Sequence, residues 1–99
     1  MKPKDIIETV ASITGIHANE IKGKRRLNEI CQARFMAAWG IKHIRPDYSF
    51  RQIARALDKE DPTFAMHAVN RANELYDGCS VFRSMRNELT RRIGMEVAA

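Results

Sequence analysis

Hydrophobic residues recur at spacings of three and four along most of the chain, which is the periodicity of amphipathic helices. The first stripe comprises Ile6, Ile7, Val10 and Ile13. We expect a helix from about residue 3 or 4 to Thr14, because Pro3 suits a first turn and Gly15 suits a C-terminal cap. A short helical turn over residues 18–22 is expected to follow and to end at Gly23.

The next stripe predicts a long helix from about Leu27 to Ile41. Its inward face comprises Ile30, Arg34, Ala37 and Ile41, with Ala33 and Ala38 beside them. A connection over residues 42–48, interrupted by Pro46, is expected after it. Ser49 and Gln52 then match a capping box, in which each side chain bonds the backbone N–H of the other. This box predicts a helix over residues 50–57, whose buried face comprises Phe50, Ile53, Ala54 and Leu57.

A charged turn over residues 58–61 leads into another helix. Asp61 is suited to cap that helix, and Pro62 to its first position, where a missing N–H costs little. We expect it to cover residues 62–76 and to end at Gly78. Its inward residues comprise Ala65, Ala68, Val69, Ala72, Leu75 and Tyr76. Ser80 is expected to cap a last helix, with an inward face of Val81, Phe82, Met85, Leu89 and Ile93.

Signals for strands are scarce, so the sequence predicts a single all-α domain over residues 1–99 with five to six helices. The helices over residues 50–57 and 62–76 are separated by a short turn. That is the layout of a helix-turn-helix, in which the second helix places its N-terminal residues in the major groove of DNA. Many helical domains contain such a pair as ordinary core helices, so this layout alone leaves both interpretations open.

Composition is that of a globular domain, with 44% hydrophobic and 29% charged residues. No apolar run approaches the ~20 residues that span a bilayer, and no signal peptide is recognisable. Two cysteines are too few for a disulfide framework, so we expect reduced thiols in a cytosolic protein. The net charge of +5 favours polyanionic partners, although many small basic domains bind no nucleic acid.

Positive charge gathers in the loop before the long helix, at Lys22, Lys24, Arg25 and Arg26. Cations at a helix N-terminus oppose the helix dipole, so the cluster fits best if phosphates lie opposite it. Arginines in a loop can also enter a narrow minor groove. A solvated basic turn is the alternative. Residues Arg83, Arg86, Arg91 and Arg92 would form a second basic face on the last helix.

Catalytic and metal-binding patterns are not recognisable. The candidates comprise His17, His43, His67, Cys31 and Cys79. They contain no Cys-x-x-Cys motif and no histidine pair one helical turn apart. We therefore expect no enzyme activity, no metal and no cofactor. His17 is expected to cap the short helix, His43 to lie in a connection, the cysteines to be buried thiols, and Trp39 to belong to the core.

Four segments together carry a resemblance to a known family. They are "DIIETVASITGI", "GKRR" followed by "QAR", the Ser-capped "SFRQIARAL", and "DPTFAMHA". Their order and spacing resemble the C-terminal DNA-binding domain (domain IV) of the bacterial replication initiator DnaA. The resemblance extends from about Asp5 to Ile93, with about one extra residue in the loop before Ser49. It implies a helical domain with a helix-turn-helix that binds double-stranded DNA.

The resemblance implies a role for individual residues. It assigns Arg26 to the minor groove, and Asp61 and Thr63 to bases in the major groove, with His67 one turn further along. It assigns phosphate contacts or neighbouring basic positions to Lys24, Arg25, Arg34 and Lys42. We expect Arg51 and Arg71 to hold phosphates as well, because phosphate contacts position a domain without reading sequence.

Departures from the family pattern occur at the most specific positions. The family usually has Gly-Gly-Arg before the aspartate, where this chain has Asp58, Lys59 and Glu60. Its base-reading histidine is replaced by Pro62, and its Thr-Thr by Thr63 and Phe64. The Phe64 ring could contact a thymine methyl group or turn into the core. We expect DNA binding to persist through the basic loop, with an altered base preference or with loss of sequence specificity.

These observations favour a sequence-specific DNA-binding regulator of replication or transcription. No Gly-x-x-x-x-Gly-Lys-Ser/Thr motif occurs, so ATPase activity is not expected. We expect a cytoplasmic, nucleoid-associated, stand-alone bacterial or phage protein that acts as a monomer or weak dimer, away from membranes. The alternative is a module that binds an initiator or another regulatory protein. Glu60 and Pro62 keep that alternative open, and Met85 and Met95 are candidate partner contacts.

Overall fold

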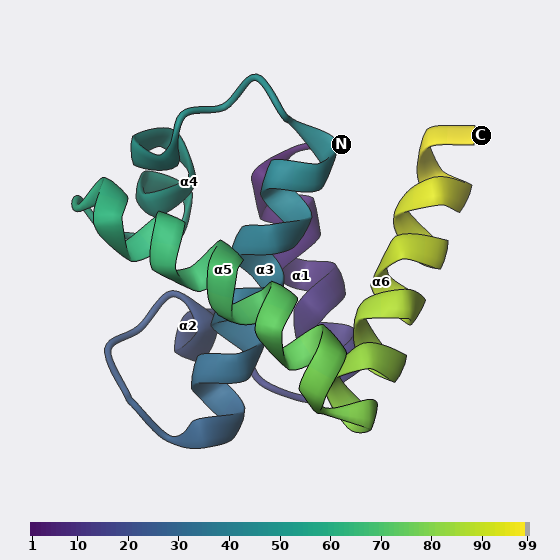
Figure 1. Cartoon of the computed structure of the whole chain (residues 1–99). Coiled ribbons are helices and arrows are strands. Elements are labelled where there is room, and N and C mark those ends of the chain that lie inside the picture. The colour runs from purple at the N-terminus through teal and green to yellow at the C-terminus, as the bar shows by residue number, and fades with distance from the viewer. Residues whose placement is uncertain (99) are drawn as a thin grey trace.

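The computed structural model describes the backbone of residues 1–98 and the side chains of residues 1–94. Within that range the chain forms six α-helices and no strand, which confirms the predicted all-α class (Figure 1). The helices are α1 (Pro3–Thr14), α2 (Ala18–Ile21), α3 (Asn28–Ile44), α4 (Phe50–Ala56), α5 (Pro62–Gly78) and α6 (Ser80–Ala98). The side chain of Met95, a candidate partner contact, lies outside the described residues.

Local sequence determines most helix ends. Gly15 terminates α1 with a left-handed φ of 76°, as expected for a C-terminal glycine cap. The Nδ1 of His17 accepts the backbone N–H of Asn19 at 3.1 Å and so caps α2. The capping box before α4 is complete, because the Ser49 hydroxyl accepts the Gln52 N–H at 3.1 Å while the Gln52 amide oxygen accepts the Ser49 N–H at 2.8 Å.

Two predicted boundaries were wrong. Helix α3 continues to Ile44, so His43 lies in its last turn and stacks on Trp39 with ring centroids 4.9 Å apart. Helix α6 includes Ser80 as its first residue, so this serine does not precede the helix as a cap. Val81 is also not inward, because 64% of its surface is exposed.

Helix α3 lies at the centre, with α5 crossing it and α1 and α6 packed beside it (Figure 1). The helices approach closely at Gly40. A Cβ atom there would lie 2.8 Å from Ile6 Cγ2 and 3.1 Å from Leu89 Cδ2. Any larger residue would therefore require the side chains of Ile6 and Leu89 to shift in a close-packed core, which explains a glycine inside a long helix.

Helix α5 packs against α3 and α4 through small residues. Ala65, Ala68 and Ala72 are fully buried and share one face of α5. Alanine lets the neighbouring backbones approach closely, so the helix lies deep in the bundle along this face. Its opposite face is consequently directed to solvent over the N-terminal half of the helix.

Candidate nucleic-acid interface

The N-terminal end of α5 is capped and its outward face is uncharged. The Asp61 Oδ1 accepts the Thr63 N–H at 2.9 Å, and Pro62 occupies the first helical position. Four exposed side chains follow along one stripe, namely Thr63, Met66, His67 and Asn70. Met66 and Asn70 were missed in the sequence analysis. The alanine spacing of the buried face carried the signal, because positions opposite Ala65 and Ala68 must face solvent.

Phe64 lies half-buried beside this stripe. Its side chain packs against the hydrophobic core, and the ammonium of Lys59 lies 5.9 Å from its ring centroid. Of the two roles considered for Phe64, this position agrees with the inward one. One part of the ring still borders the surface, where it lines a groove described below.

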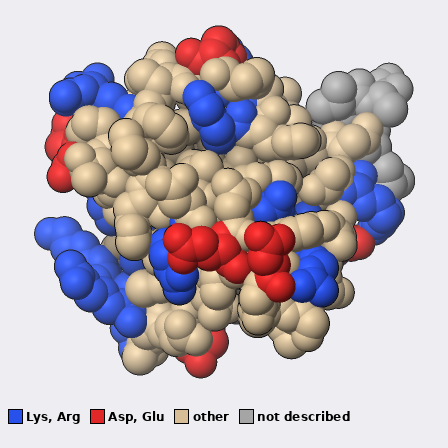
Figure 2. All heavy atoms as spheres, viewed as in Figure 1, with Lys and Arg blue, Asp and Glu red and all other residues tan. Residues whose placement is uncertain are grey.

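The basic loop, defined as residues 22–27 between α2 and α3, carries exposed cations (Figure 2). Arg25 makes a loose ion pair with Glu20, with 3.5 Å between Nη1 and Oε1. Lys24 and Arg26 are exposed, and among the described residues their side chains make no hydrogen bond or ion pair with the protein. These two cations are therefore available to an anionic partner.

Arg34 differs from this pattern, because only 5% of its surface is exposed. Its Nε donates to the Ile21 carbonyl at 2.8 Å, and its Nη2 donates to the carbonyls of Glu20 at 3.0 Å and Arg25 at 3.1 Å. The guanidinium thus donates hydrogen bonds, from inside the domain, to backbone carbonyls at the end of α2 and in the basic loop. The geometry gives Arg34 a structural role, and its phosphate contact remains a prediction.

Lys42 is likewise turned toward its own chain. Its Nζ donates to the carbonyls of Pro46 at 3.0 Å and Tyr48 at 3.1 Å, and it lies 5.3 Å from the Phe50 ring centroid. The lysine therefore closes the connection between α3 and α4. A phosphate contact by Lys42 would have to compete with both carbonyls.

The remaining predicted phosphate contacts have different surroundings. Arg51 is exposed in the first turn of α4. Arg71 is half-buried on α5, and its Nη1 lies 2.6 Å from Glu74 Oε2. An exposed ion pair of this kind contributes little stability, so a phosphate could replace Glu74 at small cost.

A groove separates the basic loop from α5 and has a volume of about 470 Å³. It is lined by Lys24, Arg26, Cys31, Arg34, Phe35, Lys59, Phe64 and His67. No carboxylate is among these lining residues, whereas four of them are cations. His67 and Phe35 form an edge-to-face ring pair with centroids 5.9 Å apart. A concave surface with one sign of charge concentrates anions, so the groove joins the loop and α5 into one basic surface.

Lys59 is the least expected member of this surface. Its Nζ donates to the carbonyls of Lys22 at 3.0 Å and Gly23 at 2.6 Å. Burial lowers the pKa of this ammonium, and the nearby positive charges of Arg34 and Lys24 lower it further, against an opposing effect of Asp58. No local pattern could have revealed these bonds, because they join residues 36 and 37 positions apart.

The second basic cluster, on α6, is engaged within the protein. The Arg86 guanidinium lies 3.8 Å from the Trp39 ring centroid and 4.1 Å from that of Tyr76, so it is held between two aromatic rings. Arg83 Nε donates to the Tyr76 carbonyl at 2.8 Å. Arg91 and Arg92 both pair with Glu88. The arginines of this second basic face are therefore bonded within the protein, in contrast to Lys24 and Arg26 of the basic loop.

Other candidate chemistry has little support in the described residues. Cys31 and Cys79 are half-buried free thiols. Among the described side chains, no group of three or more histidine, cysteine, aspartate or glutamate residues is placed to hold a metal ion. No helix in the described part of the chain is long and apolar enough to cross a membrane.

A short turn that joins α4 to a capped, outward-facing α5, with a basic loop beside it, defines a helix-turn-helix DNA-binding domain. Residues 3–72 match the family model of the bacterial DnaA protein helix-turn-helix, and the chain belongs to that family. This membership confirms the resemblance found in the sequence.

Similar curated proteins are chromosomal replication initiator proteins DnaA. The protein from Campylobacter curvus (strain 525.92) is 29% identical over 90 residues, covering 91% of this chain and 20% of the relative. The protein from Rickettsia canadensis (strain McKiel) is 32% identical over 74 residues, covering 75% of this chain and 16% of the relative. The chain therefore spans a fifth or less of the length of these relatives.

Proposed function

We propose that this protein binds double-stranded DNA in a sequence-specific manner, with the N-terminal half of α5 in the major groove and the basic loop in the adjacent minor groove. The observation that carries the proposal is the groove shared by the two elements. It brings Lys24 and Arg26 of the loop to the same surface as Phe64 and His67 of α5. Membership of the DnaA helix-turn-helix family supports the same conclusion.

In this arrangement the cations and the α5 stripe have different tasks. Arg26 enters the minor groove, where its charge is attracted by the enhanced negative potential. Lys24, Arg25, Arg51 and Arg71 hold phosphates, which position the domain. The groove between the loop and α5 then faces the sugar-phosphate strand that separates the two grooves of DNA.

Base reading is assigned to the exposed residues of α5. Thr63, His67 and Asn70 supply hydrogen-bonding groups, and an asparagine can bond the N6 and N7 edge of adenine. Met66, 47% exposed, supplies an apolar contact for a thymine methyl group. Asp61 keeps one carboxylate oxygen for a base, because Oδ1 is bonded to the Thr63 N–H. Pro62 has no donor, so the base preference differs from the family's usual site.

We propose that the protein acts in replication or transcription through DNA binding alone, without ATPase activity. It would bind as a monomer or weak dimer in the cytoplasm, associated with the nucleoid. A domain that shares sites with a full-length initiator would compete with it for those sites. The alternative role is a complex with an initiator or another regulator that needs little DNA affinity.

The test is selection from a pool of random DNA duplexes, with fluorescence anisotropy at two salt concentrations and sequencing of the bound fraction. We expect an enriched motif together with a steep loss of affinity at higher salt, because phosphate contacts release counterions. Salt-sensitive binding without a motif would restrict the function to backbone binding. Failure to bind at low salt would overturn the proposal and favour a protein partner.

A further inference from the structure

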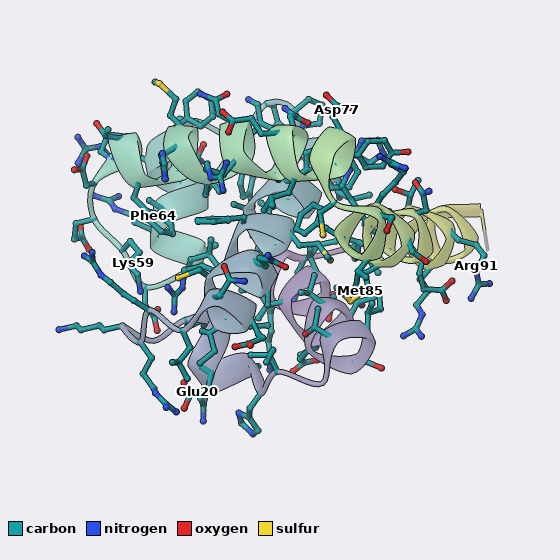
Figure 3. All side chains as sticks on the ribbon, turned by 60° about the horizontal axis from the view of Figure 1, so that its bottom comes forward. Glu20, Lys59, Phe64, Asp77, Met85 and Arg91 are labelled. Carbon is teal, nitrogen blue, oxygen red and sulfur yellow. The ribbon has the colours of Figure 1, made fainter. Side chains whose placement is uncertain are left out.

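The turn between α4 and α5 directs Lys59 toward the basic loop. Asp58 adopts a left-handed φ of 58°, and its N–H donates to the Arg55 carbonyl at 3.0 Å. The Lys59 N–H donates to the Ala54 carbonyl at 2.8 Å. Together these bonds form a Schellman motif, with aspartate at the position that glycine usually occupies. The motif reverses the chain, and Figure 3 shows Lys59 beside Phe64, at the end of the molecule opposite Arg91.

The bonds of Lys59 are unusual for a surface lysine. Its ammonium is half-buried, and its two hydrogen-bond acceptors are the backbone carbonyls of Lys22 and Gly23. Burial and the neighbouring cations lower its pKa, which means that this position is electrostatically unfavourable for a charge. Since a partly buried charge requires hydrogen-bond partners, the two carbonyls are what keep Lys59 in place.

Arg34 holds the same loop from the other side. Between them, Arg34 and Lys59 bind five carbonyls, those of Glu20, Ile21, Lys22, Gly23 and Arg25. The loop backbone is thereby turned inward, while the side chains of Lys24 and Arg26 remain exposed. Arg34 belongs to α3, which continues directly from the loop. Lys59 belongs to the turn of the helix-turn-helix, so its bonds join the loop to the other reading element.

We propose that Lys59 is a positioning residue that fixes the basic loop relative to the recognition helix α5, so that both elements reach adjacent grooves of DNA without further ordering. The inference rests on the proposed DNA-binding function. Its physical basis is that a loop held in its binding geometry loses less conformational entropy when the complex forms. Lys59 stands where the family usually has glycine, so this connection is a feature of this chain.

The first part of the test needs no DNA. Replacement Lys59→Met keeps the length and apolar stem of the side chain but removes the charge and the donors. We expect faster amide hydrogen exchange at residues 22–26, with exchange in α5 unchanged. Arg55→Met removes the same charge from the nearby last turn of α4, where the side chain pairs with Glu60, and should leave loop exchange unchanged. Lys59→Arg should restore slow exchange. Equal exchange rates in Lys59→Met and the native protein would overturn the inference.

The second part measures coupling on the selected duplex. We expect Lys59→Met to weaken affinity roughly tenfold, the scale of long-range coupling in proteins. Arg26→Ala should weaken DNA affinity much less in the Lys59→Met background than in the native one, because a loosened loop no longer holds Arg26 in place. Thr63→Ala should weaken DNA affinity by the same factor in the native protein and in Lys59→Met. Additive effects of Lys59→Met and Arg26→Ala would overturn the inference.

The controls separate this inference from the proposed function. If the native protein does not bind DNA, the proposed function fails. If it binds but Lys59 and Arg26 act additively, only the positioning role fails. Thermal unfolding of every variant shows whether it is folded, and Lys59→Gln, which retains one donor group, replaces Lys59→Met in both parts if that variant does not fold.

Discussion

Two clusters of basic residues lie at opposite ends of the molecule and behave differently (Figure 3). In the basic loop, Lys24 and Arg26 are exposed, and their side chains make no described bond to the protein. On α6, Arg83 and Arg86 bind carbonyls and aromatic rings, and the two arginines that follow pair with Glu88. Each cluster has four basic residues, yet all four on α6 are bonded within the protein, whereas Lys24 and Arg26 of the loop make no described side-chain hydrogen bond or ion pair.

The difference lies in the acceptors within reach of each cluster. The α6 arginines face the C-terminal carbonyls of α5, two aromatic rings and one carboxylate. In the loop, the carbonyls of Lys22 and Gly23 already accept the Lys59 ammonium, and that of Arg25 accepts the Arg34 guanidinium. Lys24 and Arg26 therefore have no acceptor among the described residues, which is the arrangement an anion site requires. The number of charges in a segment does not locate such a site by itself.

Replacing Arg34 should have the largest effect, because it should lower both the stability of the domain and its affinity for DNA. Arg34→Met removes the side-chain donor from the carbonyls of Glu20, Ile21 and Arg25, of which, in the described part of the chain, only Glu20 also accepts a backbone N–H, that of Gly23. We expect the free energy of unfolding to fall by at least about 3 kcal/mol, since two carbonyls lose bonds to a charged group that are each worth roughly 1.5–3 kcal/mol. Urea denaturation measures this, and DNA affinity should fall as the loop disorders. Arg51→Met, an exposed cation, is the control, and equal stability of the two variants would refute the structural role of Arg34.

Arg26→Ala and Arg91→Ala remove one charge from each cluster and compare them directly. We expect Arg26→Ala to weaken DNA binding by about 1–3 kcal/mol, as for a specific groove contact. Arg91→Ala should change affinity little, because charges beyond the ~8 Å Debye length are screened at physiological salt. Anisotropy titrations at a fixed salt concentration measure both. Similar losses in the two variants would mean that net charge alone drives binding.

Arg86→Met should affect stability without affecting DNA binding. The guanidinium lies between the Trp39 and Tyr76 rings and joins α6 to α3 and α5. We expect a loss of about 1–2 kcal/mol in unfolding free energy, the range of a partly desolvated cation–π contact. Thermal unfolding and Kd are measured on the same variant. A weakened Kd in a folded Arg86→Met protein would show that the α6 cluster takes part in binding.

The replacement Glu88→Gln should have the smallest effect, which is a change in how thermal stability depends on pH. Hydrogen bonds from Arg91 and then Arg92 lower the pKa of Glu88 from 4.5 to about 2. Because the folded-state pKa lies below the unfolded value, the stabilising contribution is complete above pH 4.5 and is lost as the pH falls toward 2. Native protein and Glu88→Gln should therefore differ slightly in Tm at pH 7 and converge near pH 2. A difference in Tm between the two proteins that grows as the pH falls would contradict the lowered pKa of Glu88.

Sequence periodicity and family resemblance made different predictions for Arg34, and the structure confirms the one from periodicity. The helical spacing placed Arg34 on the inward face with Ile30 and Ala37, whereas the resemblance implied a phosphate contact. Arg34 is buried with the other two. Periodicity could not predict the bonds of Lys42. Its acceptors at Pro46 and Tyr48 lie in a connection whose path follows no periodic pattern.

By itself the sequence determined most helix ends, the buried alanine face of α5 and the position of the helix-turn-helix. These features depend on residues within about four positions of one another, where caps and helical faces are defined. Only the tertiary structure decided which cations remain exposed and which bind the protein itself. The reason is distance along the chain, since Lys59 finds its acceptors 36 and 37 residues away and Arg86 reaches the Ala72 carbonyl 14 residues away.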